Sequence, residues 1–214
     1  MPVAIVTGAS KGFGRALTHA LASRGWDVVV DARDAEALQR ANFSPRITVL
    51  PGDVTDPDHR LELVNAVEHL DLLVNNASAL GPSPQPALAN YPLDAFTSVY
   101  EANVVAPLAL IQLALPKLTD GVIVNVSSDA AVEAYEGWGG YGSSKAALDR
   151  VSAVLAVEHP DIGVYAFDPG DMRTDMHQAA FPGEDISDRP DPETVVPSLL
   201  KLIDERPPSG RYTR

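Results

Sequence analysis

The chain has 214 residues, of which 45% are hydrophobic and 21% charged, and a formal net charge of -13. This length and composition indicate one globular domain over residues 1–214 and exclude a disordered chain. The absence of cysteine excludes disulfides and thiolate metal sites, and the five histidines lack a metal-ligand spacing, so no metal is expected. The acidic charge disfavours nucleic acid and anionic membranes as partners. No apolar run is expected to cross a bilayer and no basic segment precedes the apolar start, so we expect a cytoplasmic protein.

Short runs rich in Val, Ile and Leu alternate with longer segments of helical periodicity. The expected strands are 3–7, 28–30, 47–50, 72–75, 122–127 and 164–167, and the expected helices are 13–23, 34–41, 56–69, 93–118, 141–159 and 192–205. Strands without polar alternation are covered on both faces. The alternation therefore predicts a doubly wound, Rossmann-type α/β fold, with a parallel sheet of about seven strands and helices on both faces. In this fold the ligand site lies beyond the carboxyl ends of the strands.

Glycines cluster where the first expected strand meets the first helix, in the segment Thr7-Gly-Ala-Ser-Lys-Gly-Phe-Gly14. Their spacing, G-x-x-x-G-x-G, differs from the G-x-G-x-x-G dinucleotide fingerprint but allows the same tight turn and close backbone approach. A helix N-terminus that follows such a turn favours a bound pyrophosphate.

Tyr141 and Lys145 stand four residues apart at the start of an expected helix, and therefore lie on one face of it. A tyrosine has an ordinary pKa of about 10, and a neighbouring ammonium group favours the phenolate. This arrangement suits proton transfer. Ser128 ends an apolar run thirteen residues before Tyr141.

These features occur with Asn75-Asn-Ala-Ser78 and Pro169-Gly-Asp-Met-Arg-Thr174, each at an expected strand end. Together they resemble the motifs of the short-chain dehydrogenase/reductase family, although the family's N-N-A-G ends here in serine. The resemblance implies that Ser128 binds the substrate oxygen, that Tyr141 transfers the proton, and that Lys145 lowers the pKa of Tyr141 and holds the nicotinamide ribose.

Asn103 completes the expected catalytic group. Pro107, four residues later, removes a backbone donor and frees the Asn103 carbonyl, which in the family holds a relay water beside the lysine. Ser127 is a rival for the serine role, but the thirteen-residue spacing favours Ser128. Tyr135 is a rival tyrosine whose position four residues later is Gly139, not lysine.

The resemblance also implies which residues bind the cofactor. They are Gly8, Ser10, Lys11, Gly12, Phe13, Gly14, Arg33, Asp53, Val54, Asn75, Ala77, Tyr141, Lys145, Pro169, Gly170, Met172 and Thr174. Ala32 stands where NAD-preferring members carry aspartate, and Arg33 and Lys11 suit a 2'-phosphate, so NADP(H) is favoured over NAD(H). A one-residue shift of the strand end would instead make Asp31 the ribose ligand.

The leading prediction is an NADP-dependent carbonyl reductase acting on a small-molecule carbonyl or alcohol. The alternatives are an NAD-dependent hydroxyl dehydrogenase and a non-catalytic nucleotide-sensing protein of the same fold. Substrate choice is expected to reside in segments 79–90, 129–140 and 175–190. In the family, dimers pair the helices expected here at 93–118 and 141–159, so a homodimer is expected. The tail from Pro208 resembles the start of the family's final strand, and its shortness leaves a tetramer open.

Overall fold

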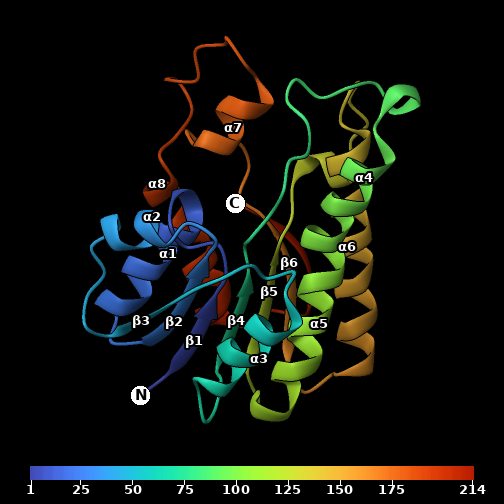
Figure 1. The fold of residues 1–214 in the computed structure, drawn as a ribbon. Coiled ribbons are helices and arrows are strands. Elements are labelled where there is room, and N and C mark those ends of the chain that lie inside the picture. The colour runs from blue at the N-terminus through green and yellow to red at the C-terminus, as the bar shows by residue number, and fades with distance from the viewer.

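All seven strands run parallel in one sheet of order β3-β2-β1-β4-β5-β6-β7 in the computed structural model, which describes residues 1–214 (Figure 1). The strands are β1 (Val3–Val6), β2 (Asp27–Ala32), β3 (Ile47–Pro51), β4 (Leu72–Asn75), β5 (Val122–Val126), β6 (Gly163–Asp168) and β7 (Gly210–Thr213). The predicted doubly wound α/β fold is therefore confirmed. The chain begins at β1, builds outward to β3 and returns to add β4 on the other side of β1, which leaves a crevice above β1 and β4.

Eight α-helices connect or flank the strands. They are α1 (Gly12–Ser23), α2 (Ala35–Arg40), α3 (Pro57–Asn65), α4 (Leu93–Tyr100), α5 (Ala106–Ala114), α6 (Gly139–Glu158), α7 (Asp175–Ala180) and α8 (Pro192–Glu205). Short 3-10 turns occupy η1 (Leu88–Asn90), η3 (Leu115–Lys117) and η4 (Asp129–Ala131), and a π-helical turn, η2 (Glu101–Val105), separates α4 from α5. The sequence predicted neither α7 nor the early end of α3 at Asn65.

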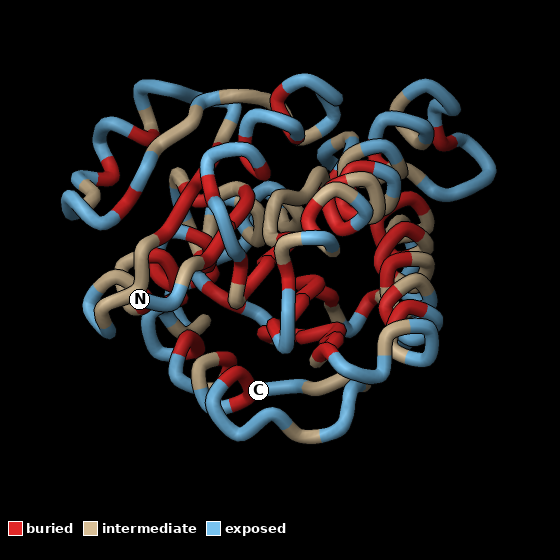
Figure 2. Tube along the Cα trace, turned by 90° about the horizontal axis from the view of Figure 1, so that it is seen from below, coloured by how far each residue is buried: buried red, intermediate tan, exposed pale blue.

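Each face of the sheet has its own apolar core. Neighbouring residues of β1 point to opposite sides, so that Ala4 and Val6 pack with α1 and α8, while Ile5 packs with α3 and α5. The two layers of helices lie to the left and right of the sheet in Figure 1, and the buried chain concentrates at the centre of Figure 2. Burial on both faces explains the continuous apolar runs of the strands.

The segment Leu93–Lys117 corrects one expectation, because by length and composition alone it is apolar enough to cross a membrane. In this fold its α5 part packs Leu110, Ile111 and Ala114 into the core beneath the sheet. The apolar character of α5 thus serves packing against the strands.

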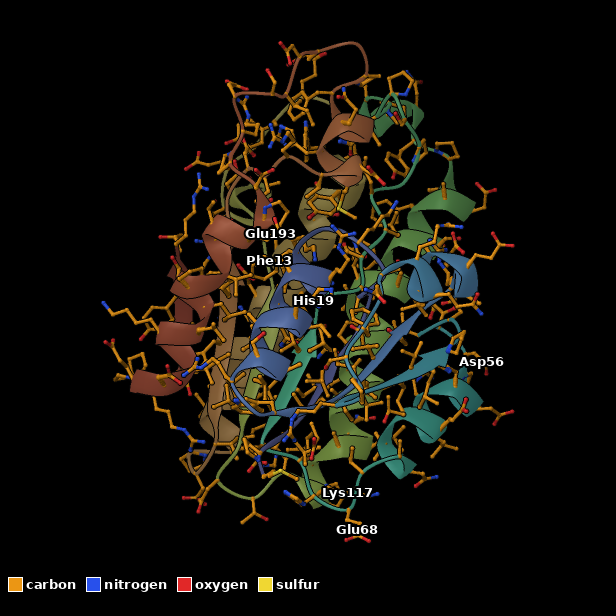
Figure 3. All side chains as sticks on the ribbon, turned by 90° about the vertical axis from the view of Figure 1, so that its left-hand side faces the viewer. Phe13, His19, Asp56, Glu68, Lys117 and Glu193 are labelled. Atoms are coloured by element: carbon orange, nitrogen blue, oxygen red, sulfur yellow. The ribbon has the colours of Figure 1, made fainter.

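The loops that carry the motifs gather at one end of the sheet. In Figure 3, Phe13 at the start of α1 lies near Glu193 at the start of α8, whereas Glu68 and Lys117 mark the opposite end. Parallel strands bring their carboxyl ends to a single edge, so residues distant in sequence meet there.

Candidate active site

A cavity of about 1430 Å³ opens along the carboxyl edge of the sheet. It is lined by most of the predicted residues: Gly8, Ser10, Lys11, Gly12, Phe13, Arg33, Asp53, Val54, Ala77, Ser128, Tyr141, Lys145, Pro169, Gly170, Met172 and Thr174. Three predicted residues, Gly14, Asn75 and Asn103, do not line it. Each of these three supports the walls of the cavity from behind.

The glycine-rich loop follows β1 and passes very close to the turn after β4. Gly8 has a φ of +68°, and a Cβ there would lie 2.7 Å from the Ala77 Cα. A Cβ on Gly14 would collide with the side-chain nitrogen Nδ2 of Asn76 and would lie 2.7 Å from the Gly8 carbonyl oxygen. Glycine is therefore required at both positions, at Gly8 for conformation and space and at Gly14 for space alone.

The side chain of Asn75, which the sequence predicted to contact the cofactor, does not line the cavity, because it points into the sheet and donates to Asn125 Oδ1 at 2.8 Å. The next residue, Asn76, reaches the crevice and donates through Nδ2 to the carbonyls of Thr7 and Gly8 at 2.8 and 3.1 Å. Successive residues of a strand face opposite sides, so sequence resemblance alone did not separate the roles of this pair.

Ser128, Tyr141 and Lys145 meet at the floor of the cavity. Ser128 lies after β5, and the other two lie one turn apart on α6, with Lys145 Nζ 5.5 Å from the centroid of the Tyr141 ring. Lys145 is 2% exposed, and its ammonium group donates to the Val126 carbonyl at 2.7 Å. The predicted catalytic group is thus brought together by β5 and α6.

The direction of the Tyr141 pKa differs from the expectation. Burial raises the pKa of Tyr141 above its ordinary value, while the neighbouring hydroxyls of Ser78 and Ser128 oppose this rise. Burial also lowers the pKa of Lys145 to about 8, against the attraction of Asp149. Removing a phenolate and an ammonium from water costs more here than their mutual attraction returns. Burial therefore favours the protonated form of Tyr141.

Asn103 holds the wall of the site together, at the centre of the predicted helix irregularity. Its Oδ1 accepts hydrogen bonds from the Ala79 amide at 2.7 Å and the Ser78 hydroxyl at 3.1 Å. Its Nδ2 donates to the Ala79 carbonyl and to Ser144 Oγ, both at 2.9 Å. Ser144 in turn donates to the Tyr141 carbonyl. The amide of Asn103 thus clamps the turn after β4 to α6.

Sequence reasoning noted Ser78 only as a departure from the family motif and did not assign it to the site. The structure places its hydroxyl between Asn103 and the phenol of Tyr141, at the wall of the cavity. The available sequence signal was Ser78 itself, a hydroxyl side chain at a position where the family carries glycine, which has no side chain.

At the other end of the cavity, Asp31 is buried within its own hydrogen bonds. Its carboxylate accepts from the Gly8 amide at 2.8 Å and pairs with His59 Nε2 at 3.1 Å. Burial raises the pKa of Asp31. The hydrogen bond that His59 makes with Asp31 raises the pKa of His59. Arg33 is exposed on the cavity wall, near Asp53. Although partial burial opposes it, hydrogen bonds from Thr55 lower the pKa of Asp53.

The substrate end of the cavity combines aromatic and charged groups. Trp138 lines it, with its ring edge-on to Tyr141 at a centroid distance of 5.9 Å. The nearby side chains of Glu133, Tyr135 and Glu136 do not line it. The helix α7 adds a further wall and bears Asp175, which pairs with Lys11 across the opening at 2.9 Å. Both members of this pair are well exposed, so the pair is weak.

The fold and this cavity together define a Rossmann-type oxidoreductase. The family model described as short chain dehydrogenase matches residues 2–185. The chain belongs to the short-chain dehydrogenase family.

Known proteins agree with this family membership. The chain is 35% identical over 184 residues to an uncharacterized oxidoreductase of Saccharomyces cerevisiae, covering 81% of this chain and 72% of the relative. It is 31% identical over 228 residues to sepiapterin reductase of Xenopus laevis, covering 96% and 83%. It also resembles the crystal structure of a short chain dehydrogenase of Shigella flexneri complexed with NADP, at a TM-score of 0.91 and 28% identity, covering 99% and 95%.

Replacing Asn103 by Asp tests the clamp without any substrate. The carboxylate would face the Ala79 carbonyl and Ser144, and burial would raise its pKa above the unfolded value of about 3.9. A raised carboxyl pKa means that stability is lost as pH rises from the unfolded pKa through the folded one. Urea denaturation should therefore show a larger loss of stability, relative to the parent protein, at pH 8 than at pH 5.

The control variant is Asn103→Ala, which leaves buried partners unpaired at about 1–3 kcal/mol each and should show a loss of stability that is independent of pH. Equal losses for N103D at both pH values would contradict a buried, donor-dependent clamp.

Proposed function

We propose that the protein is an NADP(H)-dependent carbonyl reductase that interconverts a carbonyl compound and its alcohol by a Ser-Tyr-Lys mechanism. The observation that carries the proposal is the placement of the Tyr141 phenol at the floor of the cavity, beside the hydroxyl of Ser128 and with the Lys145 ammonium 5.5 Å from the centroid of its ring. A buried acid beside a hydroxyl donor suits protonation of a developing alkoxide. The relative from Xenopus laevis is itself named a reductase, which agrees with this direction.

The residues present fit a dinucleotide phosphate. The close approach of Gly8 to Ala77 leaves backbone where a side chain would stand, and the N-terminus of α1 follows directly. Lys11, Arg15 and Arg33 line the same part of the cavity and supply positive charge for phosphate groups.

The position of Asp31 supports NADP(H) over NAD(H). A free carboxylate there would bind the ribose hydroxyl and repel a 2'-phosphate. Instead, Gly8 and His59 already occupy both oxygens of Asp31, and Arg33 is left on the cavity wall. The Shigella flexneri structure, which is complexed with NADP, agrees with this choice.

The chain's own residues then carry the proton chemistry. NADPH, when bound, supplies the hydride for the carbonyl carbon. Ser128 donates a hydrogen bond to the substrate oxygen, and Tyr141 gives that oxygen its phenolic proton. Once the proton has left, the Lys145 ammonium nearby stabilises the phenolate. Asn103 holds α6 in position against the turn that bears Ser78, because its amide bonds both.

Tyr141→Phe tests the proposed reaction. The ring and its packing remain while the proton donor is lost, so NADPH binding should stay within a few-fold and kcat for ketone reduction should fall about 10²-fold or more. The measurements are NADPH titration by tryptophan fluorescence and steady-state NADPH oxidation with a panel of ketones. Turnover of a confirmed substrate by Y141F at the parent rate would rule out the assigned acid.

Arg33→Ala tests the choice of cofactor. Loss of one charge-assisted hydrogen bond to a 2'-phosphate should weaken NADPH binding about tenfold to hundredfold and leave NADH binding nearly unchanged. Arg40→Ala is a matched control, because Arg40 is exposed, pairs with Glu36 and does not line the cavity. If R33A and R40A gave the same ratio of NADPH to NADH affinity as the parent protein, Arg33 would have no role in discrimination.

We also propose that the protein forms a homodimer and resides in the cytoplasm, as the sequence leads us to expect. The support for the dimer is a row of exposed valines on the two contacting elements η2 and α6. Val105, Val154 and Val157 are 45%, 47% and 81% exposed, and η2 and α6 pack against each other. Such a surface favours burial against a second copy of the chain.

Val157→Asp tests the dimer by placing a charge on that surface. The parent protein should have twice the 22.7 kDa mass of one chain in light scattering at micromolar concentration, and V157D should shift toward the monomer. Leu61→Asp is the control, since Leu61 is an exposed residue of α3, outside both elements. A parent protein that scatters as a monomer would refute the dimer.

A further inference from the structure

Asp129 is an exposed carboxylate on the cavity wall, directly after the serine of the site. Its Oδ1 accepts from Ser128 Oγ at 2.9 Å and from the Ala130 amide at 2.8 Å. Its Oδ2 accepts from the Tyr135 hydroxyl at 3.0 Å. No lysine, arginine or histidine lies within salt-bridge distance of it. Three neutral donors thus hold this charge beside the reacting groups.

The contact between Ser128 and Asp129 has a consequence for substrate binding. A serine hydroxyl has a single hydrogen, and here that hydrogen is given to the carboxylate. Ser128 Oγ also accepts from the Ala130 amide at 3.2 Å. Ser128 therefore donates to a substrate carbonyl only after it leaves Asp129, which gives up a charge-assisted hydrogen bond.

We propose that the substrate carries its own hydrogen-bond donor next to the carbonyl, as an α-hydroxy or α-amino ketone or aldehyde does. The donor replaces the Ser128 hydrogen on Asp129, and the Ser128 hydroxyl turns to the carbonyl oxygen. The inference rests on the proposed carbonyl chemistry of this site and adds the class of carbonyl compound to it. In the complex Asp129 accepts a hydrogen from the substrate in place of the one from Ser128, and Ser128 still donates its own, so recognition has little desolvation cost.

The surroundings of Asp129 define the rest of this substrate. Leu80, Trp138 and Met176 form an apolar patch around Tyr141, which favours an aromatic or aliphatic body. Two cations lie near this end, and neither is free for a carboxylate. Arg211, which donates to the Ser128 carbonyl, is paired with Asp149 and Asp168, and Arg173 is paired with Asp191. An α-keto acid would place its carboxylate against Asp129 without a compensating cation, and is therefore disfavoured.

Three phenyl ketones test the inference: 2-hydroxyacetophenone, which has the adjacent donor, acetophenone, which lacks it, and phenylglyoxylate, which carries an adjacent carboxylate. Each is reduced by the parent protein, D129A, D129N and the control E133Q, whose exposed carboxylate does not line the cavity. The measured quantity is kcat/KM with NADPH. Comparing the ratio of two substrates between proteins cancels the intrinsic reactivity of each ketone.

In the parent protein and in E133Q, the hydroxyketone should be preferred over acetophenone by about tenfold or more, and phenylglyoxylate should be the poorest substrate. In D129A the hydroxyketone preference should fall at least about tenfold, and acetophenone reduction should hold or improve because Ser128 is released. D129N keeps the shape without the charge and should improve phenylglyoxylate relative to acetophenone. A hydroxyketone to acetophenone ratio that is the same in the parent protein, D129A and D129N would overturn the inference.

A binding measurement separates this inference from the proposed reaction. With NADP⁺ present, quenching of the fluorescence of Trp138 should report tighter binding of 1-phenyl-1,2-ethanediol than of 1-phenylethanol, and D129A should lose this difference. If the difference were found without any turnover, the recognition by Asp129 would stand and the proposed reaction would fail. If ketones were reduced without the preference, the reaction would stand and this inference would fail. Absence of both binding preference and turnover would overturn the two together.

Discussion

The hydrogen bonds that join the ends of β1 and β4 are the constraint on which the site depends. Thr7, the residue after β1, accepts through Oγ1 from the amides of Asn76 and Ala77 at 3.1 and 3.0 Å. The chain leaves these two strands in opposite directions across the sheet, and these hydrogen bonds, with those from Asn76 to the carbonyls of Thr7 and Gly8, hold the two loops of the crevice together. The same turn continues to the residues that Asn103 binds, so one chain of contacts links the glycine loop to Tyr141.

Burial decides the electrostatic state of the reaction centre. The sequence led us to expect that Lys145 lowers the pKa of Tyr141, but in the folded chain the ammonium donates to a backbone carbonyl and the phenol is raised in pKa by its surroundings. The lysine itself has a pKa lowered to about 8. A site of this kind keeps a cation within reach of a phenolate formed at Tyr141.

Much of the fold and the site was predictable because each signal is local. A run of valines marks a strand buried on both faces, and a four-residue spacing places Tyr141 and Lys145 on one helical face. The glycines before α1 are demanded by backbone conformation, as the positive φ of Gly8 demonstrates. Short or weakly periodic elements such as α7 were missed, because six residues carry too little of a helical pattern.

The sequence by itself determined the order of the predicted strands and helices and the glycine turn. It also singled out Ser128 after β5 and Tyr141 and Lys145 on α6, since all these features depend on neighbours along the chain. Only the tertiary structure decided that Asn76 rather than Asn75 reaches the crevice and that Asp31 is held by Gly8 and His59. It also decided that the Ser78 hydroxyl donates to Asn103 and that Asp129 accepts from the Ser128 hydroxyl. These outcomes depend on which side chain at the end of a strand faces the cavity and on which residues of other segments it meets there. They are properties of packing between distant segments, and no local pattern encodes them.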